Sequence, residues 1–177
     1  MQELKTIGKY TFFYKDWVSN FHPSEFVHHT PFGPSPEDVV CYTSEQAYQL
    51  DKARYFRDME MAELIRQTKD PQTCLLLGNR VKNFDAKSWD KVKSATMRLA
   101  VREKYEGNVF LANKLVMLVA DGITLVEASL TDTYWGIGMN LDDPDIGDPA
   151  KWKGKNELGR ILTRVANDIA YKLVNGK

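Results

Sequence analysis

Apolar side chains recur three or four positions apart along most of this chain, which is the spacing of one helix face. This pattern, together with capping residues such as Thr43, predicts helices over five segments: 44–56, 58–68, 89–105, 109–120 and 154–174. A sixth helix is expected to begin at Asp70-Pro71, because proline suits a first helical turn, and to end near Asn83.

Short runs rich in β-branched and aromatic residues predict strands over 10–14, 39–43 and 123–129. The segment 28–40 holds three of the seven prolines, so we expect a loop there. The segment 132–152 is rich in glycine, aspartate and proline, and a loop of this length in a compact domain is typically functional.

Together these elements predict an α+β fold, mostly helical with a small β-sheet, in a single compact domain over residues 1–177. Hydrophobic residues make up 43% of the chain, which is enough for a substantial core. The 24 basic and 24 acidic residues give zero formal net charge, whereas proteins that bind a nucleic-acid backbone usually have a basic excess. Tight binding over a long DNA footprint is therefore disfavoured, and binding of a nucleotide or a strand end stays open.

The first ten residues, MQELKTIGKY, contain no apolar signal core, and no apolar run reaches the length of a membrane span. We therefore expect a cytoplasmic protein with no membrane partner. The two cysteines, Cys41 and Cys74, lie in apolar contexts and are expected to be buried thiols, with a disulfide as the alternative.

Several kinds of catalytic site are disfavoured by the motifs. The three histidines form no HExxH motif, and the acidic run 142–148 lacks the glycine and terminal glutamate of a calcium loop, so no metal is expected. No GxSxG motif occurs, and Cys41 has no evident histidine partner. The glycines of 136–141 lack the strand–turn–helix setting of a dinucleotide fingerprint, and no cofactor is expected.

The polar positions of segment 44–56 include a stripe of three residues. Glu45, Gln49 and Lys52 stand at i, i+4 and i+7 and so share one helix face. Taken alone, this stripe is typical of a solvated face, since glutamate suits a first turn and glutamine and lysine are good helix formers. The aromatic residues of the same helix favour broad contact with the rest of the protein, and the stripe would then line a cleft.

Three segments offer groups that could bind a nucleotide. Gly154 and Lys155 precede a helix whose free N–H groups and positive dipole end suit a phosphate, the alternative being a plain helix start capped by Asn156. The segments 13–21 and 132–138 place aromatic rings beside Asn and Asp side chains, which suits stacking on a flat base. The alternative is that the rings fill the core and the polar side chains cap turns.

The motifs of the chain, in their order, resemble those of the NADAR superfamily, also called YbiA-like proteins. The resemblance covers nearly the whole chain. No single motif is specific to the family, but the set of motifs in this order is specific. It is carried by SNFHPSEF (19–26), YTSEQAYQLDKARYF (42–56), the pattern DPxxxxxLG (70–78), VKNFDAKSWDKVKSATM (81–97), LVEAS with DTYWGIG (125–138) and WKGKNELGRIL (152–162).

The resemblance implies a compact, mainly helical domain whose characterised relatives cleave N-glycosidic bonds. One group acts on ribosylated pyrimidine intermediates of riboflavin synthesis, and another removes ADP-ribose from modified guanine in nucleic acid. It thus implies an N-glycosidase acting on a small nucleotide or an ADP-ribosylated nucleobase, free or presented on DNA or RNA, with no obligate protein partner.

Carried over residue by residue, the resemblance places catalytic roles on Glu45, Lys52 and Asp132. It implies substrate binding by Asn20, Phe21, Trp89, Trp135, Gly154, Lys155 and Asn156, to which Gln49, from the same stripe, and Gly136, next to Trp135, are added as candidates. The segment 139–151 is longer than the matching link of some bacterial relatives, which leaves the choice of substrate open, since this loop is expected to border the site.

Cleavage of a C1′–N bond builds positive charge on the sugar and negative charge on the leaving base. Glu45 is expected to stabilise the sugar cation or to activate water, with Asp132 as a second carboxylate. Lys52, if its pKa is lowered by partial burial, could instead attack C1′ and form a Schiff base. The alternatives are a module that binds NAD or ADP-ribose without turnover, and an interaction protein with an inactive site.

Overall fold

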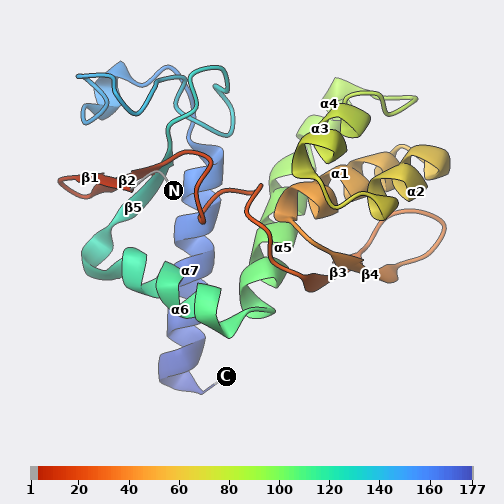
Figure 1. Cartoon of the computed structure of the whole chain (residues 1–177), viewed down its shortest axis with the longest axis horizontal. Helices are drawn as coiled ribbons and strands as arrows, with labels where there is room; N and C mark the ends of the chain where they lie inside the picture. Colours follow the sequence, from red (N-terminus) through yellow and green to blue (C-terminus); the bar gives the residue numbers. More distant parts are fainter. Residues whose placement is uncertain (1–3, 177) are drawn as a thin grey trace. The chain divides into compact units, whose positions relative to one another are not determined.

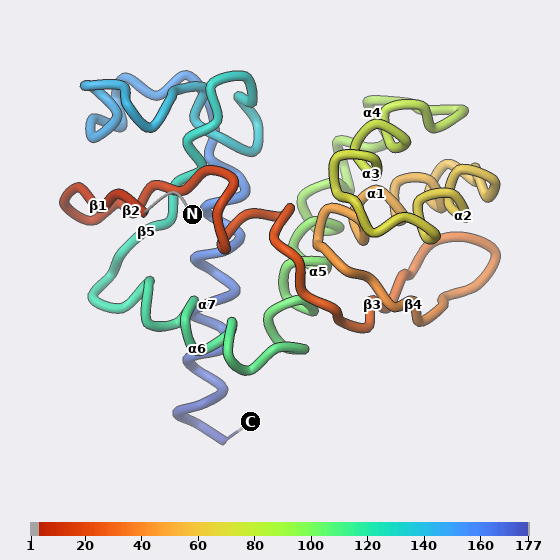
Figure 2. Tube along the Cα trace, in the orientation of Figure 1, coloured from red at the N-terminus to blue at the C-terminus, as the bar shows by residue number. Residues whose placement is uncertain are grey.

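The computed structural model describes residues 4–176, which form two compact units. Within the described residues, one unit consists of residues 4–19 and 109–176, and the other is Asn20–Asn108. Figure 1 labels the elements of both units, and Figure 2 traces the chain from the first unit through the second and back. Helices predominate and the strands form two small sheets, which confirms the predicted α+β class. The assignment of 1–177 to one domain stays a prediction.

The first unit is built on a three-stranded sheet in the order β1-β2-β5. β2 (Tyr10–Phe13) runs antiparallel to β1 (Lys5–Ile7) and parallel to β5 (Thr124–Glu127). β2 and β5 confirm two predicted strands, whereas β1 was not expected because its residues are all exposed and show no buried face. α7 (Glu157–Asn175) packs against β5, and α6 (Val109–Leu118) packs against α7.

The long segment after β5 is a loop, as predicted, but it has a core of its own. Met139, Leu141 and Ile146 are buried in one cluster with Phe12 of β2. The indole Nε1 of Trp152 donates a 2.8 Å hydrogen bond to the carbonyl of Ile146. The segment therefore folds against its own unit, and between β5 and α7, all of which the structure describes, the one regular element is the short 3₁₀ turn η2 (Pro149–Lys151). Another 3₁₀ turn, η1 (Ala120–Gly122), precedes β5.

The second unit contains a two-stranded antiparallel sheet of β3 (Phe26–Thr30) and β4 (Glu37–Cys41). The prediction of a loop over 28–40 is therefore wrong outside the connection 31–36, whereas the strand predicted over 39–43 overlaps the end of β4. The three prolines of that segment lie in the connection 31–36, where they cannot interrupt the pairing of the strands. Along β3, buried and exposed side chains alternate, as in a strand with one face toward the core. His28 occupies one of the buried positions, and because a polar residue there breaks the alternation of apolar and polar residues, the sequence did not indicate this strand.

Helix α1 (Ser44–Tyr55) starts where the capping pattern predicts. Oγ1 of Thr43 accepts a 3.0 Å hydrogen bond from the N–H of Gln46. The amide of Gln46 reaches back to accept from the N–H of Tyr42 at 2.7 Å. Because α1 packs against α2, α3 and α5, ten of its twelve residues are buried. This burial decides against a solvated face for most of the helix.

The remaining helices of this unit differ from the predictions mainly at their ends. α2 is Met59–Gln67, and α3 is Pro71–Gly78 and ends earlier than expected. The helix expected over 89–105 is interrupted, giving α4 (Ala86–Asp90) and α5 (Lys93–Glu106). α4 ends because the N–H groups of the next two residues, Lys91 and Val92, donate to the carbonyls three positions earlier in the chain. These hydrogen bonds form a tight 3₁₀-type turn that closes the helix.

No helix within residues 4–176 is both long and apolar enough to cross a membrane. In that same range, no group of three or more His, Cys, Asp or Glu side chains is arranged to hold a metal ion.

Candidate functional site

The candidate residues fall into two sets, one in each unit. The unit Asn20–Asn108 carries the stripe of α1 together with three binding candidates: Asn20, Phe21 and Trp89. The other unit carries the loop candidates and those before α7: Asp132, Trp135, Gly136, Gly154, Lys155 and Asn156.

The polar stripe of α1 is largely buried. Glu45 is 6% exposed and Gln49 is 3% exposed. Nε2 of Gln49 donates a 2.7 Å hydrogen bond to Oε1 of Glu45, one helical turn away. The interpretation of this stripe as an ordinary solvated face is therefore wrong for Glu45 and Gln49, while Lys52 at its end is half-buried.

Lys52 lies in surroundings that favour its neutral amine. Burial lowers the pKa of Lys52 below the ordinary lysine value, and the negative charge of Glu45 opposes this change only in part. Nζ of Lys52 lies 4.6 Å from the centre of the Phe84 ring. Phe84, which the sequence analysis did not single out, is thus part of the surroundings of the candidate nucleophile.

Asn20 is bonded to the first turn of α1. Its backbone carbonyl accepts from the N–H of Glu45 at 3.2 Å, and its side-chain Oδ1 accepts from the hydroxyl of Ser44 at 3.0 Å. Nδ2 of Asn20 lies 3.1 Å from Sδ of Met97. These contacts fix the start of the helix that carries Glu45. The next residue, Phe21, is half-buried.

Trp89 lies in an aromatic cluster. Its indole Nε1 donates a 3.0 Å hydrogen bond to the hydroxyl of Tyr48, and its ring packs near those of Tyr48, Tyr55 and Phe56. Trp89 is 4% exposed. Packing accounts for its position, and its role in substrate binding stays a prediction.

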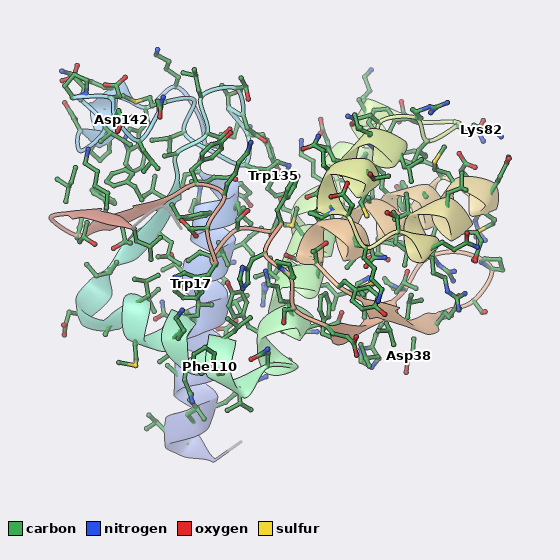
Figure 3. All side chains as sticks on the ribbon, in the orientation of Figure 1. Trp17, Asp38, Lys82, Phe110, Trp135 and Asp142 are labelled. Atoms are coloured by element: carbon green, nitrogen blue, oxygen red, sulfur yellow. The ribbon has the colours of Figure 1, made fainter. Side chains whose placement is uncertain are left out.

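In the other unit, Asp132 organises the loop after β5. Its Oδ1 accepts hydrogen bonds from the N–H groups of Tyr134 at 2.8 Å and Trp135 at 2.7 Å. The half-buried Trp135 ring stands edge-on to Tyr134, with ring centres 4.9 Å apart. Figure 3 labels Trp135 in this loop. The loop thus fixes the backbone at Trp135 through one oxygen of the carboxylate.

The segment before α7 packs closely against this loop. A Cβ on Gly154 would overlap the carbonyl oxygen of Gly136 and lie 2.8 Å from Cα of Thr133. A Cβ on Gly136 would lie 2.9 Å from the carbonyl oxygen of Glu127. Both positions therefore require glycine because backbone approaches backbone.

The amides at the start of α7 are used within the protein. The N–H groups of 155–158 donate to four carbonyls of the loop, those of Thr133, Gly136, Tyr134 and Trp135, at 2.9 to 3.1 Å. The prediction that this helix start offers free N–H groups is therefore wrong, and the helix begins at Glu157 rather than at 154. The loop carbonyls occupy the position that a phosphate would take.

Asn156 and Lys155 differ in how they are held. Asn156 has a left-handed backbone with φ of 54°; its Oδ1 accepts from the N–H of Glu127 and its Nδ2 donates to the carbonyl of Leu125, both at 2.9 Å. It therefore ties α7 to β5 and does not cap the helix with its side chain. Lys155 is exposed, with Nζ 5.1 Å from the centre of the Tyr134 ring.

A buried charged cluster was missed by the sequence analysis. Nδ1 of His28 lies 2.5 Å from Oε2 of Glu103, and its Nε2 lies 3.1 Å from Oδ2 of Asp51. Burial alone would lower the pKa of His28, but the two carboxylates outweigh it and raise that pKa to about 9. Residues from β3, α1 and α5 meet here, and only the inward position of His28 could have signalled it.

This chain is similar to a known family, to two named relatives and to one solved structure. The family model described as NADAR domain matches residues 12–170. Protein irg-1 of Caenorhabditis elegans is 31% identical over 159 residues, covering 85% of this chain and 74% of its own length. N-glycosidase R617 of Acanthamoeba polyphaga mimivirus is 33% identical over 133 residues, covering 75% and 77%.

A solved structure has the same fold. The NMR structure of the Escherichia coli protein YbiA matches with a TM-score of 0.72 and 27% identity, over 94% of this chain and 88% of that one.

Proposed function

Because the chain belongs to the NADAR domain family, we propose that it is an N-glycosidase, a hydrolase that cleaves the bond between C1′ of a ribose and a nitrogen of a base. The name of the mimivirus relative supports this proposal. The observation that carries it is the stripe of α1, where a buried carboxylate and an amine of lowered pKa stand on one helix face.

The two groups fit the charges that develop when the bond breaks. The sugar becomes cationic and the base becomes anionic in the transition state, so a site needs a negative group near the sugar. Glu45 supplies that charge, and its hydrogen bond from Gln49 holds one of its oxygens in place. A carboxylate in this position also takes protons from water or from an attacking amine.

Lys52 is proposed as the nucleophile. The lone pair of Nζ attacks C1′ while the amine gives a proton to Glu45, and the C1′–N bond breaks with its electron pair going to the base, which takes a proton. The sugar ring then opens: the C1′–O4′ bond breaks, O4′ takes a proton and an iminium forms between C1′ and Nζ. Water adds to C1′ and gives up a proton, the C1′–Nζ bond breaks with its electron pair returning to Nζ, and the sugar leaves as the open-chain aldehyde with the amine of Lys52 free.

The proposed substrate is a ribosylated or ADP-ribosylated nucleobase, either ADP-ribosylated guanine or a ribosylaminopyrimidine phosphate. In the unit that contains the loop after β5, Oδ1 of Asp132 already accepts hydrogen bonds from two backbone N–H groups. We therefore assign proton transfer to the other carboxylate oxygen of Asp132. With the helix amides used internally, phosphate binding is assigned to the exposed side chain of Lys155. In the unit Asn20–Asn108, which carries Glu45 and Lys52, Phe21 is proposed to stack on the base.

The proposal is tested by measuring release of free base from both substrates in parallel, by chromatography and mass spectrometry. Glu45→Gln and Lys52→Ala should each lower the rate roughly 100-fold or more, the usual effect of losing an acid–base or nucleophilic group. Lys82→Ala is the matched control, because that lysine is 65% exposed and pairs with Glu60 on the surface.

Two outcomes would contradict the proposal, the first its enzymatic activity and the second the role of Glu45. An intact ligand that nevertheless binds, as seen by calorimetry, would favour a module that senses ADP-ribose without turnover. Full activity in Glu45→Gln would place the chemistry elsewhere in the chain.

A further inference from the structure

We infer that Gln49 is a positioning residue that holds the carboxylate of Glu45, and that Gly78 of α3 is the residue that fixes Gln49. This inference rests on the proposed role of Glu45. The sequence led us to expect that Gln49 binds substrate directly. We propose instead that Gln49 acts on the substrate only through Glu45.

The first observation is the contact itself. Nε2 of Gln49 donates to Oε1 of Glu45 at 2.7 Å, and the two residues are four positions apart on α1. Gln49 is 3% exposed, so its amide has little freedom to turn toward solvent. The donor therefore stays in front of one oxygen of the carboxylate.

The second observation is the close approach of Gly78. A Cβ at this position would overlap Oε1 of Gln49 and would lie 2.5 Å from its Cδ and 3.1 Å from its Cγ. Gly78 does not have a positive φ, so its backbone conformation does not require glycine. What requires glycine here is the space that the Gln49 amide occupies.

The third observation is the carbonyl end of the same amide. Oε1 of Gln49 is buried and has no hydrogen-bond partner among residues 4–176. Turning the amide over would place this oxygen against the Glu45 carboxylate, which repels it when ionised. The fold leaves one acceptor unsatisfied and thereby presents an N–H group to the ionised carboxylate.

Gly78→Ala, Gln49→Ala and the double variant test this arrangement. A methyl group on residue 78 meets the far end of a flexible side chain, so Gly78→Ala should fold with the Gln49 amide displaced. Folding is checked by circular dichroism and urea unfolding. The carboxyl carbon of Glu45 is then titrated by NMR in each variant, and release of base is measured as kcat.

We expect the Glu45 titration midpoint to move to higher pH in both single variants, because the carboxylate loses a donor that favours its charged form. kcat should fall roughly 10- to 100-fold, as expected when a reacting group is displaced by about 1 Å. In the Gln49→Ala background, Gly78→Ala should add nothing further, since the side chain it displaces is gone.

Gln67→Ala is the matched control. Nε2 of Gln67 donates to Oε1 of Glu63 at 2.9 Å with the same four-residue spacing, but on the exposed face of α2. This variant should leave both the Glu45 titration and kcat unchanged.

An unchanged Glu45 titration in Gln49→Ala and Gly78→Ala would overturn the inference, as would a Gly78→Ala effect that persists without Gln49. If the titrations move as expected and wild-type protein releases no base, the positioning stands and the proposed function fails.

Discussion

Nζ of Lys52 lies 4.6 Å from the centre of the Phe84 ring, on the helix face that also carries Glu45. Burial is the largest influence on this amine and lowers its pKa, while the charge of Glu45 acts in the opposite direction. The ring face also favours the charged form. Burial prevails, and Lys52 is left with more neutral amine than an exposed lysine at the same pH.

The reactivity of Lys52 should follow from this balance. Acetylation by limiting acetic anhydride, measured by mass spectrometry across pH, should reach its midpoint below the ordinary lysine range of about 10.4. Glu45→Gln should move the midpoint lower still, because it removes the charge that favours the ammonium form. A midpoint in the ordinary range would contradict the burial of the amine.

The loop contact at Gly154 predicts a loss of stability. Gly154→Ala should lower the free energy of unfolding by about 1–3 kcal/mol or more, since the added methyl group meets backbone atoms that cannot turn aside. Gly147→Ala is the control, because its methyl group would meet side-chain atoms of Ile7, with the nearest at 3.0 Å. Urea unfolding compares the two, and an equal loss in both would contradict the close packing at Gly154.

The His28 cluster predicts how stability depends on pH. The pKa of His28 is raised from 6.5 to about 9 in the folded protein. As the pH rises, the unfolded chain therefore loses this proton at a lower pH than the folded protein does. Its contribution to stability is complete below about pH 6.5 and is lost as pH rises through about 9.

Urea unfolding at a series of pH values between 6 and 10 measures this loss. His28→Gln should flatten the dependence, and Asp51→Asn should narrow the window because one of the two carboxylates that raise the pKa is gone. The same slope in wild type and His28→Gln would contradict the assignment of this pH dependence to His28.

Trp89→Phe separates a packing role from a binding role. The variant loses the hydrogen bond to Tyr48 and some buried area, so the free energy of unfolding should fall by about 1–3 kcal/mol while KM stays close to wild type. Equilibrium unfolding and steady-state kinetics check this. A raised KM with an unchanged free energy of unfolding would show that Trp89 binds substrate.

The sequence predicted those elements whose signals are local. Helix α1 begins at its Thr43 cap, and β2 and β5 follow short apolar runs. The strand predicted over 39–43 overlaps the end of β4, but β3 and the start of β4 were missed because three prolines dominated the segment, whereas these prolines are confined to the connection 31–36. Proline content describes a segment, while strand pairing depends on which residues of it face the core.

The site was less predictable because its decisive contacts join distant parts of the chain. The amide of Glu157 donates to the carbonyl of Tyr134, far away in sequence, so a local pattern could not show that the helix start was occupied. In the same way, the stripe of α1 has a composition typical of a solvated face. Packing of α2, α3 and α5 around that helix buries Glu45 and Gln49.

The most direct test of the account is borohydride trapping during turnover. Wild-type protein is incubated with ADP-ribosylated guanosine or a ribosylaminopyrimidine phosphate, reduced with sodium borohydride and mapped by peptide mass spectrometry. We predict a sugar adduct on Lys52 that requires both substrate and reductant and is absent from Lys52→Ala. Release of base without any adduct, together with an active Lys52→Ala variant, would contradict the covalent mechanism.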